Sequence, residues 1–390
     1  MSVPRTAYDD VVVAAPTTLP YVRYSIRGAH WFLAGALAEL IKRAELAKHQ
    51  IDGLCVSSFT MSPDTAVGLT QHLGLTLRWL DHIPMGGACG IVALRRAARA
   101  VQCGDADIVA CIAGDTNHTD TFRLNLATFS QFARDAVYPY GSGGANASFA
   151  FLTSYYMRTY GATSEDFGKL CVAQRANALT FPHALMKKPL TLQEYLTARL
   201  IADPLRLFDC VMPCAGADAF LVLRRGRAEA LGLPTARILA TIERHNAFPD
   251  DPIQYRGGWA LDCDELYAQA GVGPADVDVL ATYDDYPVIT LMQIEDLGFC
   301  KKGEAPDFVR RHSFTADGSF PINTSGGQLS AGQAGAAGGY LGLVEAMRQL
   351  TGRPLGTPVP DARIGVVSGF GMINYDRGLA SGAAVLARAA

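Results

Sequence analysis

The sequence lacks the marks of several large protein classes. No run of Lys and Arg exceeds two residues and the formal net charge is -3, so nothing in the chain would neutralise a row of nucleic-acid phosphates. No apolar run approaches the ~20 residues that a membrane-spanning helix needs, and residues 1–21 contain no basic segment followed by an apolar one. These absences predict a cytoplasmic protein that binds no nucleic acid and has no membrane span.

Ordered cysteine spacing is also missing. The nine cysteines are an odd number, are scattered through apolar segments and form no Cys-x-x-Cys pair. Disulfide frameworks and zinc sites both depend on such spacing. We therefore expect most of these cysteines to be small buried side chains, and we expect no metal site in this chain.

What the sequence does contain is a repeated alternation of apolar strands and helices. Its 390 residues are 49% hydrophobic and 18% charged, which suits one large core or two fused halves. Strands that are apolar on both faces and alternate with helices indicate an α/β protein with a mostly parallel sheet covered on both sides. The predicted strands are residues 10–14, 51–58, 76–83 and 106–113, and then 236–245, 277–283 and 362–368.

The order of these elements predicts two similar halves. They comprise residues 1–230 and 231–390, with buried central helices at 91–101 and 341–350. Residues 115–203 interrupt the alternation in the first half. An insertion of this length in a compact fold is usually functional, so we expect a lid or binding surface, or else a dimerisation cap.

A glycine-rich loop, residues 323–339, leads directly into the second central helix. Glycines this dense allow close backbone approach, and a following helix N-terminus offers free N–H groups. The loop resembles the thiolase signature Asn-x-x-Gly-Gly followed by Gly-His-Pro-x-Gly-Ala-Ser-Gly, with Gln333 at the place of the catalytic His. The residues that this resemblance assigns to an oxyanion or thioester pocket are Asn323, Ser325, Gly326 and Gly327.

Further motifs resemble one branch of the thiolase superfamily, the sterol-carrier-protein-x or lipid-transfer-protein-like thiolases. They occur in matching order and cover nearly the whole chain: Lys188-Pro189-Leu190-Thr191, Ala202-Asp203-Pro204-Leu205, Gly216-Ala217-Asp218-Ala219, Tyr283-Asp284-Asp285-Tyr286 and Glu295-Asp296-Leu297-Gly298. The resemblance implies a duplicated five-layer αβαβα thiolase fold and a homodimer. It also implies a coenzyme A thioester as substrate.

The nucleophile of a thiolase is a cysteine at a helix N-terminus. Residues 86–95 resemble that turn, but an ungapped alignment places Gly87 at the nucleophile and Cys89 two residues later. Cys89 is thus either a displaced nucleophile or a packed small residue. If it is the nucleophile, its pKa should lie well below the ordinary ~8.5 because of the helix end.

The other two conventional catalytic groups are also replaced. No histidine follows His312, and Gln333 can hydrogen-bond but cannot take a proton. At the second cysteine, the nearest polar side chain is Ser368. Conventional thiolysis is therefore expected to be feeble or absent.

Tyr283 falls where related proteins carry Asn or His. A phenol can donate a hydrogen bond to an enolate oxygen or, when ionised, accept a proton from a hydroxyl. The resemblance extends to retro-aldolases that work with a small zinc-ribbon/OB-fold partner, although Tyr283 could also be a packing aromatic. Asp284 and Asp285 are turn caps or catalytic carboxylates.

His118 follows the strand predicted at residues 106–113, at a carboxyl end where α/β sites gather. It could act as a base, or it could be a surface or interface residue. The apolar strand itself is expected to lie at a sheet edge and to form the homodimer contact.

Three classes of function remain open at this stage. The chain could be an enzyme on acyl-CoA, either an acetyl-CoA acetyltransferase-type acyltransferase or a lyase of carbon–carbon bonds. It could be a catalytically silent acyl-CoA or lipid binder. It could also be one subunit of a complex whose partner supplies the missing groups.

Overall fold

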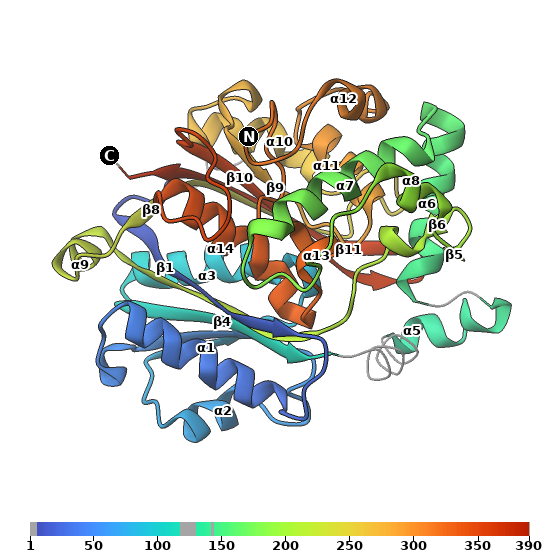
Figure 1. Cartoon of the computed structure of the whole chain (residues 1–390). Coiled ribbons are helices and arrows are strands. Elements are labelled where there is room, and N and C mark those ends of the chain that lie inside the picture. The colour runs from blue at the N-terminus through green and yellow to red at the C-terminus, as the bar shows by residue number, and fades with distance from the viewer. Residues whose placement is uncertain (1–5, 118–129, 142–143, 390) are drawn as a thin grey trace.

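The computed structural model describes residues 6–117, 130–141 and 144–389 (Figure 1). Nine strands are hydrogen-bonded in the order β3-β2-β4-β7-β1-β8-β11-β10-β9. Those of the first half are β1 (Val11–Val22), β2 (Gly53–Ser57), β3 (Trp79–His82), β4 (Ile108–Thr116) and β7 (Ala215–Arg224). Those of the second half are β8 (Thr235–His245), β9 (Val279–Ala281), β10 (Ile364–Asn374) and β11 (Arg377–Arg388).

The strand order repeats on either side of the β1–β8 junction. Outward from β1 the strands are β7, β4, β2 and β3, and outward from β8 they are β11, β10 and β9. The second half has no strand that corresponds to β3 among the described residues; a parallel bridge between Leu280 of β9 and Ile322 takes that place. β1 and β8 pair antiparallel over three residue pairs, which joins the two half-sheets at their edges. The short helix α9 (Arg225–Ala230) lies between the halves, and the division near residue 230 stays a prediction.

The sheet is mixed, with more antiparallel than parallel neighbours. Only β2–β3, β2–β4 and β9–β10 are parallel among its described pairs, which corrects the expectation of mostly parallel pairing. The expectation that residues 106–113 form an edge strand is wrong, because β4 pairs with β2 on one side and β7 on the other. An apolar strand of this kind is a central strand, and the edge of this half-sheet is β3.

Helices complete five layers. α1 (Ala29–Arg43) and α2 (Ala66–Leu73) cover one outer face, and α10 (Trp259–Ala270) and α11 (Pro287–Asp296) cover the other. α3 (Cys89–Cys103) and α14 (Gly338–Leu350) lie between the two half-sheets (Figure 1). The thiolase-type architecture expected from the sequence is confirmed.

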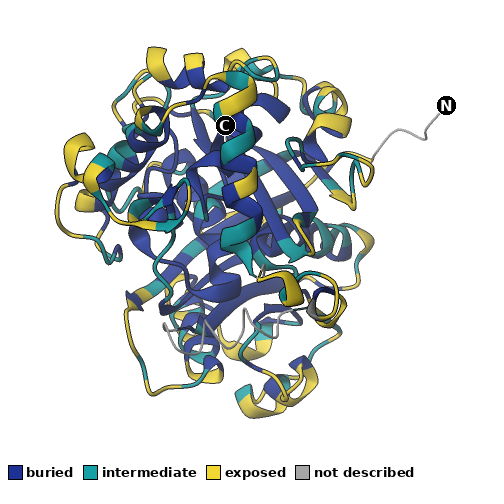
Figure 2. Ribbon diagram, turned by 90° about the vertical axis from the view of Figure 1, so that its right-hand side faces the viewer, coloured by how far each residue is buried: buried dark blue, intermediate teal, exposed yellow. Residues whose placement is uncertain are grey.

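Side-chain alternation in the strands explains the layering. Val12 and Ala14 of β1 pack in the cluster under α1, whereas Val11 and Val13 pack in the central cluster with α3 and α14. Most residues of the two central helices are buried, as predicted for 91–101 and 341–350, and Figure 2 shows the buried layers at the centre of the molecule.

The insertion forms a helical cap on the second half. It contains α5 (Gln131–Arg134), α6 (Ala145–Tyr160), α7 (Ser164–Thr180), α8 (Leu192–Thr197) and β5 (Leu200–Ala202), and β6 (Leu205–Arg206) follows it directly and pairs with β5. α7 packs on α12 (Ala305–Arg311) and α13 (Gly327–Ala331), and α6 packs on α11. Within the described part of the chain, no helix is long and apolar enough to cross a membrane.

Candidate active site

The ring of Tyr283 lies directly against the backbone of Gly87. Tyr283 follows β9, and Gly87 lies in the turn before α3. A Cβ added to Gly87 would be 1.9 Å from Cε2 and 2.2 Å from Cζ of the phenol, and 2.3 Å from the carbonyl oxygen of Phe370. The phenol therefore occupies the space into which a side chain at position 87 would project. A cysteine nucleophile there and Tyr283 in this position exclude each other.

The Tyr283 hydroxyl is held between a carboxylate and an amide. It donates to Oδ2 of Asp285 at 2.7 Å, and the side chain of Gln333, on the glycine loop, is near enough to influence its pKa. Burial, followed by the Asp285 charge, raises the pKa of the phenol well above its usual value, and Gln333 opposes this rise. The phenol is thus neutral at physiological pH.

Asp285 is the acceptor beside this neutral phenol. Burial raises its pKa to about 7; the hydrogen bond from Tyr283 lowers the pKa and the nearby charge of Asp284 raises it. Its second oxygen, Oδ1, is buried and has no hydrogen-bond partner among the described residues. Asp285 can therefore change its protonation state near neutral pH, and it has a free acceptor atom.

The side-chain amide of Gln293, in α11, forms two hydrogen bonds to the backbone of Tyr283. Its Oε1 accepts from the Tyr283 N–H at 3.1 Å, and its Nε2 donates to the Tyr283 carbonyl at 2.7 Å. Ser368 of β10 donates to the same Oε1 at 2.6 Å. Gln293 was not predicted as a site residue; its signal in the sequence is a polar residue inside a largely apolar helix.

The side chain of Asn323 forms hydrogen bonds to the segment that carries Tyr283 and does not point into an open pocket. It has a left-handed backbone with φ 47, its Oδ1 accepts from the Thr282 N–H at 2.9 Å, and its Nδ2 donates to Thr282 Oγ1 at 3.1 Å. Both ends of the amide are thereby engaged in fixing the strand end that carries Tyr283. The expected role as an oxyanion donor stays a prediction, which these contacts do not favour.

Ser325, Gly326 and Gly327 are likewise packed against protein. All three are buried. A Cβ on Gly326 would lie 2.4 Å from that of Ala178 in α7, and a Cβ on Gly327 would lie 2.0 Å from Oδ2 of Asp284. These glycines allow the loop to approach α7 and Asp284 closely, so their expected contact with a bound thioester also stays a prediction.

Asp284 caps the short helix of the glycine loop. Its Oδ1 accepts from the Gln328 N–H at 2.9 Å, and its Oδ2 accepts from the Leu329 N–H at 3.3 Å. A carboxylate is well suited to the N–H groups at a helix start. Of the two aspartates, Asp284 is thus the cap, and only Asp285 faces the phenol.

Asp115 positions the far end of the loop and was not identified from the sequence. The fully buried carboxylate accepts from the Ala336 N–H, the Thr60 N–H and the Ser58 hydroxyl, each at 2.7 Å. Nearby, Gln333 accepts through Oε1 from the Gly335 N–H at 3.0 Å. The loop that brings Gln333 to Tyr283 is therefore tied to the end of β4.

Cys89 is the first residue of α3 and is fully buried. Its thiol donates to the Ala336 carbonyl at 3.0 Å. Burial raises the pKa of this thiol far above its usual value, which favours the packed small residue of the two alternatives, and the role of Cys89 as a nucleophile stays a prediction. The desolvation of a thiolate between α3 and α14 outweighs the attraction of the helix end.

Alkylation should therefore leave Cys89 intact in the native protein. We expect iodoacetamide to modify the exposed Cys103 first, because the thiol of Cys103 is accessible and that of Cys89 is not. Peptide mass spectrometry over time would measure both sites, and unfolding in guanidinium should make all nine cysteines reactive. Native labelling of Cys89 as fast as that of Cys103 would contradict this description.

The structure thus brings Tyr283, Gln333 and the Gly87 turn together, with Cys89 packed behind them. His118 lies outside the described residues, and its expected role stays a prediction. The N-termini of α3 and α14 meet at this point: a Cβ on Gly339 would lie 2.8 Å from the Cys89 sulfur and 2.8 Å from the Gly86 carbonyl. The duplicated topology with two helix starts at one site defines a protein of the thiolase fold.

Comparison with known proteins identifies the family to which the chain belongs. The family model described as "Thiolase C-terminal domain-like" matches residues 257–380. The chain is 33% identical to the 17-hydroxy-3-oxo-4-pregnene-20-carboxyl-CoA lyase of Mycobacterium tuberculosis, over 87% of this chain and 91% of that protein. It is 32% identical to the steroid side-chain-cleaving aldolase of Thermomonospora curvata, over 86% and 89%.

Among solved structures, the Ltp2-ChsH2(DUF35) aldolase superposes with a TM-score of 0.80 at 26% identity, covering 97% of this chain and 98% of that one. The chain belongs to the thiolase superfamily, in its sterol-carrier-protein and lipid-transfer-like branch.

Proposed function

We propose that this protein cleaves a carbon–carbon bond of a 3-hydroxyacyl-CoA thioester by a retro-aldol reaction centred on Tyr283. The observation that carries the proposal is the phenol lying in the space above Gly87 where a nucleophilic side chain would project. A thiolase reaction needs a thiolate at that place, and Gly87 has no side chain. The lyase and aldolase activities named for two relatives support the same choice.

The chemistry begins with the 3-hydroxyl of the substrate donating to the Tyr283 oxygen. The phenol passes its own proton to Asp285 as it takes the substrate proton, so no free phenolate has to form. The C2–C3 bond then breaks, C3 becomes a ketone or aldehyde carbonyl, and the bonding electron pair becomes a thioester enolate. Protonation of C2 through the same pair gives the shortened acyl-CoA, and no other reactant is consumed.

The helix ends supply the electrostatic part of the proposed site. Each helix N-terminus carries roughly half a positive charge, and those of α3 and α14 meet beside Gly87. An enolate oxygen that develops there is stabilised by fixed dipoles, which often give the largest single contribution to catalysis. Gln333 supports the same step because it lowers the pKa of the phenol and, unlike a histidine, cannot take a proton.

The proton relay predicts a pH dependence. Cleavage requires ionised Asp285, so kcat/KM should rise with pH through about 7, the raised pKa of this carboxyl, and level off above it. Asp285→Asn should lower kcat/KM by ~10²–10⁴-fold, the usual contribution of general acid–base catalysis, and should remove this rise. Asp284→Asn, which alters a helix cap, is expected to lower thermal stability and to keep the rise, displaced to lower pH because the Asp284 charge raises the pKa of Asp285. An unchanged pH profile in Asp285→Asn would rule out the relay.

The proposed cofactor requirement is coenzyme A as the thioester carrier, with no metal bound by this chain. The proposed assembly is a cytoplasmic homodimer that works with a small zinc-ribbon/OB-fold protein. The structurally similar Ltp2-ChsH2(DUF35) aldolase includes a DUF35 component, which supports such a partner. The outer edge of β3 has no strand partner within the described residues, which makes it the edge most open to a second copy.

Product analysis tests the proposal. A 3-hydroxyacyl-CoA should yield a carbonyl product and a shorter acyl-CoA in equal amounts, with the candidate partner present and no free coenzyme A added. Binding of the thioester without cleavage, with and without the partner, would leave a silent acyl-CoA binder. Absence of binding in both cases would leave a structural subunit.

A further inference from the structure

Ser368 of β10 carries a buried hydroxyl that the proposed reaction does not use. It is the polar side chain nearest the place of a thiolase's second cysteine, and 5% of its surface is exposed. Its hydroxyl donates to Oε1 of Gln293 at 2.6 Å. The hydroxyl is thus engaged with helix α11 rather than with the reacting groups.

The Gln293 amide makes every hydrogen bond that an amide side chain can make. Its Oε1 accepts from the Tyr283 N–H at 3.1 Å and from the Ser368 hydroxyl. Its Nε2 donates to the carbonyl oxygens of Tyr283 at 2.7 Å and Ile289 at 2.9 Å. An amide has two donor hydrogens and two acceptor lone pairs, so these four partners use all of them and fix which end of the amide is oxygen.

Gln293 takes the place of a strand partner for Tyr283. The parallel pairing of β9 with β10 ends at Ala281 and Val367, so the backbone of Tyr283 lies beyond that pairing. A buried N–H or C=O group without a partner is costly, and the Gln293 amide satisfies both groups of this one residue. The position of the Tyr283 backbone, from which the phenol projects over Gly87, therefore depends on α11.

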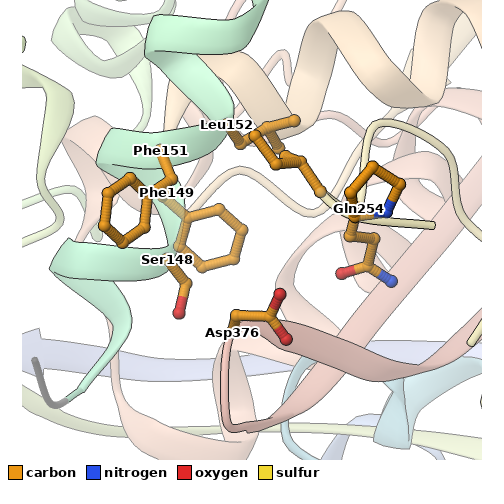
Figure 3. Close-up of a pocket in the computed structure, with 8 residues that line it drawn as sticks. Ser148, Phe149, Phe151, Leu152, Gln254 and Asp376 are labelled. Atoms are coloured by element: carbon orange, nitrogen blue, oxygen red, sulfur yellow. The ribbon is translucent and has the colours of Figure 1, made fainter. Parts of the chain in front are cut away.

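Packing on the cap side holds the same segment less firmly. Phe149 of α6 stacks on Tyr286 at 4.5 Å between ring centroids, and Phe149 also lines a pocket of about 260 Å³ (Figure 3). A side chain that borders a cavity lacks partner atoms on one side, so Phe149 can yield. The hydrogen bonds from Gln293 are therefore the firmer of the two contacts that hold residues 283–286.

We propose that Gln293 is a positioning residue for the reaction, and that Ser368 locks its amide in the orientation that Tyr283 needs. This inference rests on the proposed retro-aldol function. The phenol has little room to move, because its ring fills the space above Gly87 and Asp285 accepts its hydroxyl at 2.7 Å. A shift of the Tyr283 backbone would lengthen the bond to Asp285. Ser368 thus acts on the phenol through Gln293.

Ser368→Ala tests this role by removing one of the four bonds. We expect kcat to fall about tenfold with KM little changed, since a shift of ~1 Å at a reacting group can cost about a hundredfold. The hydrogen bond from Tyr283 lowers the pKa of Asp285, which lies at about 7. A longer bond lowers this pKa less, so the rise of kcat/KM should move to higher pH. Ser368→Cys keeps a weaker donor and should show smaller changes of both kinds.

The pH midpoint reports the bond between Tyr283 and Asp285. The other titratable groups that face Asp285 are Asp284, Tyr286 and, after β6, Cys210. Neither substitution at position 368 replaces any of these groups, so a moved midpoint follows from the phenol.

Thermal unfolding tests the positioning without any cleavage assay. Tyr283→Phe removes the bond to Asp285, and its loss of Tm should be smaller in the Ser368→Ala background than in the wild type, because that bond is already weakened there. Substitutions at independent sites have additive effects. Ser381→Ala is the matched control, because Ser381 of β11 is 4% exposed and its hydroxyl accepts from the Gly258 N–H at 3.0 Å. Its effect should add to that of Tyr283→Phe and leave the pH midpoint in place.

The outcomes separate this inference from the function on which it rests. Additive losses of Tm for Ser368→Ala and Tyr283→Phe, or an active Ser368→Ala variant with an unmoved pH midpoint, would overturn the positioning role. Losses that are not additive, in a protein that cleaves no 3-hydroxyacyl-CoA, would support the role and reject the retro-aldol reaction. Losses that are not additive, together with a midpoint at higher pH, support both.

Discussion

Replacing Gly87 with alanine should lower kcat/KM for carbon–carbon cleavage by about a hundredfold or more. The added methyl group would lie 1.9 Å from the Tyr283 ring, closer than any real contact allows, so the phenol must move. A shift of ~1 Å at a reacting group can cost about a hundredfold in rate. The measurement is steady-state cleavage of a 3-hydroxyacyl-CoA with the partner present.

A second glycine provides the control for this substitution. Gly226 in α9 has nothing within 4 Å of an added Cβ, so Gly226→Ala should retain full activity and equal or greater thermal stability. If Gly87→Ala were as active as the wild type, the phenol could not be the group that reacts. In that case the close packing of Tyr283 on Gly87 would be structural only.

Removing the Tyr283 hydroxyl should have an even larger effect. In Tyr283→Phe the ring still covers Gly87, but the 2.7 Å hydrogen bond to Asp285 disappears. We expect kcat to fall by ~10²–10⁴-fold, the range for loss of a proton-transferring group. Binding of the acyl-CoA, measured by calorimetry, should change little, because the phenol acts on the reacting bond.

Another buried phenol–aspartate pair allows a matched comparison. Tyr195 donates to Oδ1 of Asp209 at 2.5 Å in the cap. Tyr195→Phe removes the same kind of bond and should destabilise the fold by ~1–3 kcal/mol, without a comparable loss of kcat. Equal losses of activity in the two variants would show that Tyr283 acts through stability rather than chemistry.

Much of the fold could be predicted from residue patterns, and most of the site could not. Apolar strands alternating with helices led to the duplicated layers and to the buried helices α3 and α14. The same patterns could not distinguish a central strand from an edge strand, because both faces of β4 are apolar in either case. Only the pairing with β2 and β7 decided this point.

The site depends on contacts between distant segments. Tyr283 and Gly87 were both notable in the sequence, but their mutual exclusion appears only when β9 ends beside the turn before α3. The two alternatives for Cys89 stayed open because helix position is visible in a sequence and burial is not. Asp284 and Asp285 are adjacent and chemically alike, and the fold alone makes one a helix cap and the other the partner of the phenol.

Coenzyme A balance is the measurement that tests the retro-aldol proposal most directly. The purified protein, with its candidate partner, should convert a 3-hydroxyacyl-CoA into one carbonyl product and one shorter acyl-CoA without consuming free coenzyme A. The same preparation should leave a 3-oxoacyl-CoA uncleaved when coenzyme A is supplied, because no side chain at Gly87 can attack it. Rapid consumption of free coenzyme A with two acyl-CoA products would contradict the proposal and would require a reactive cysteine.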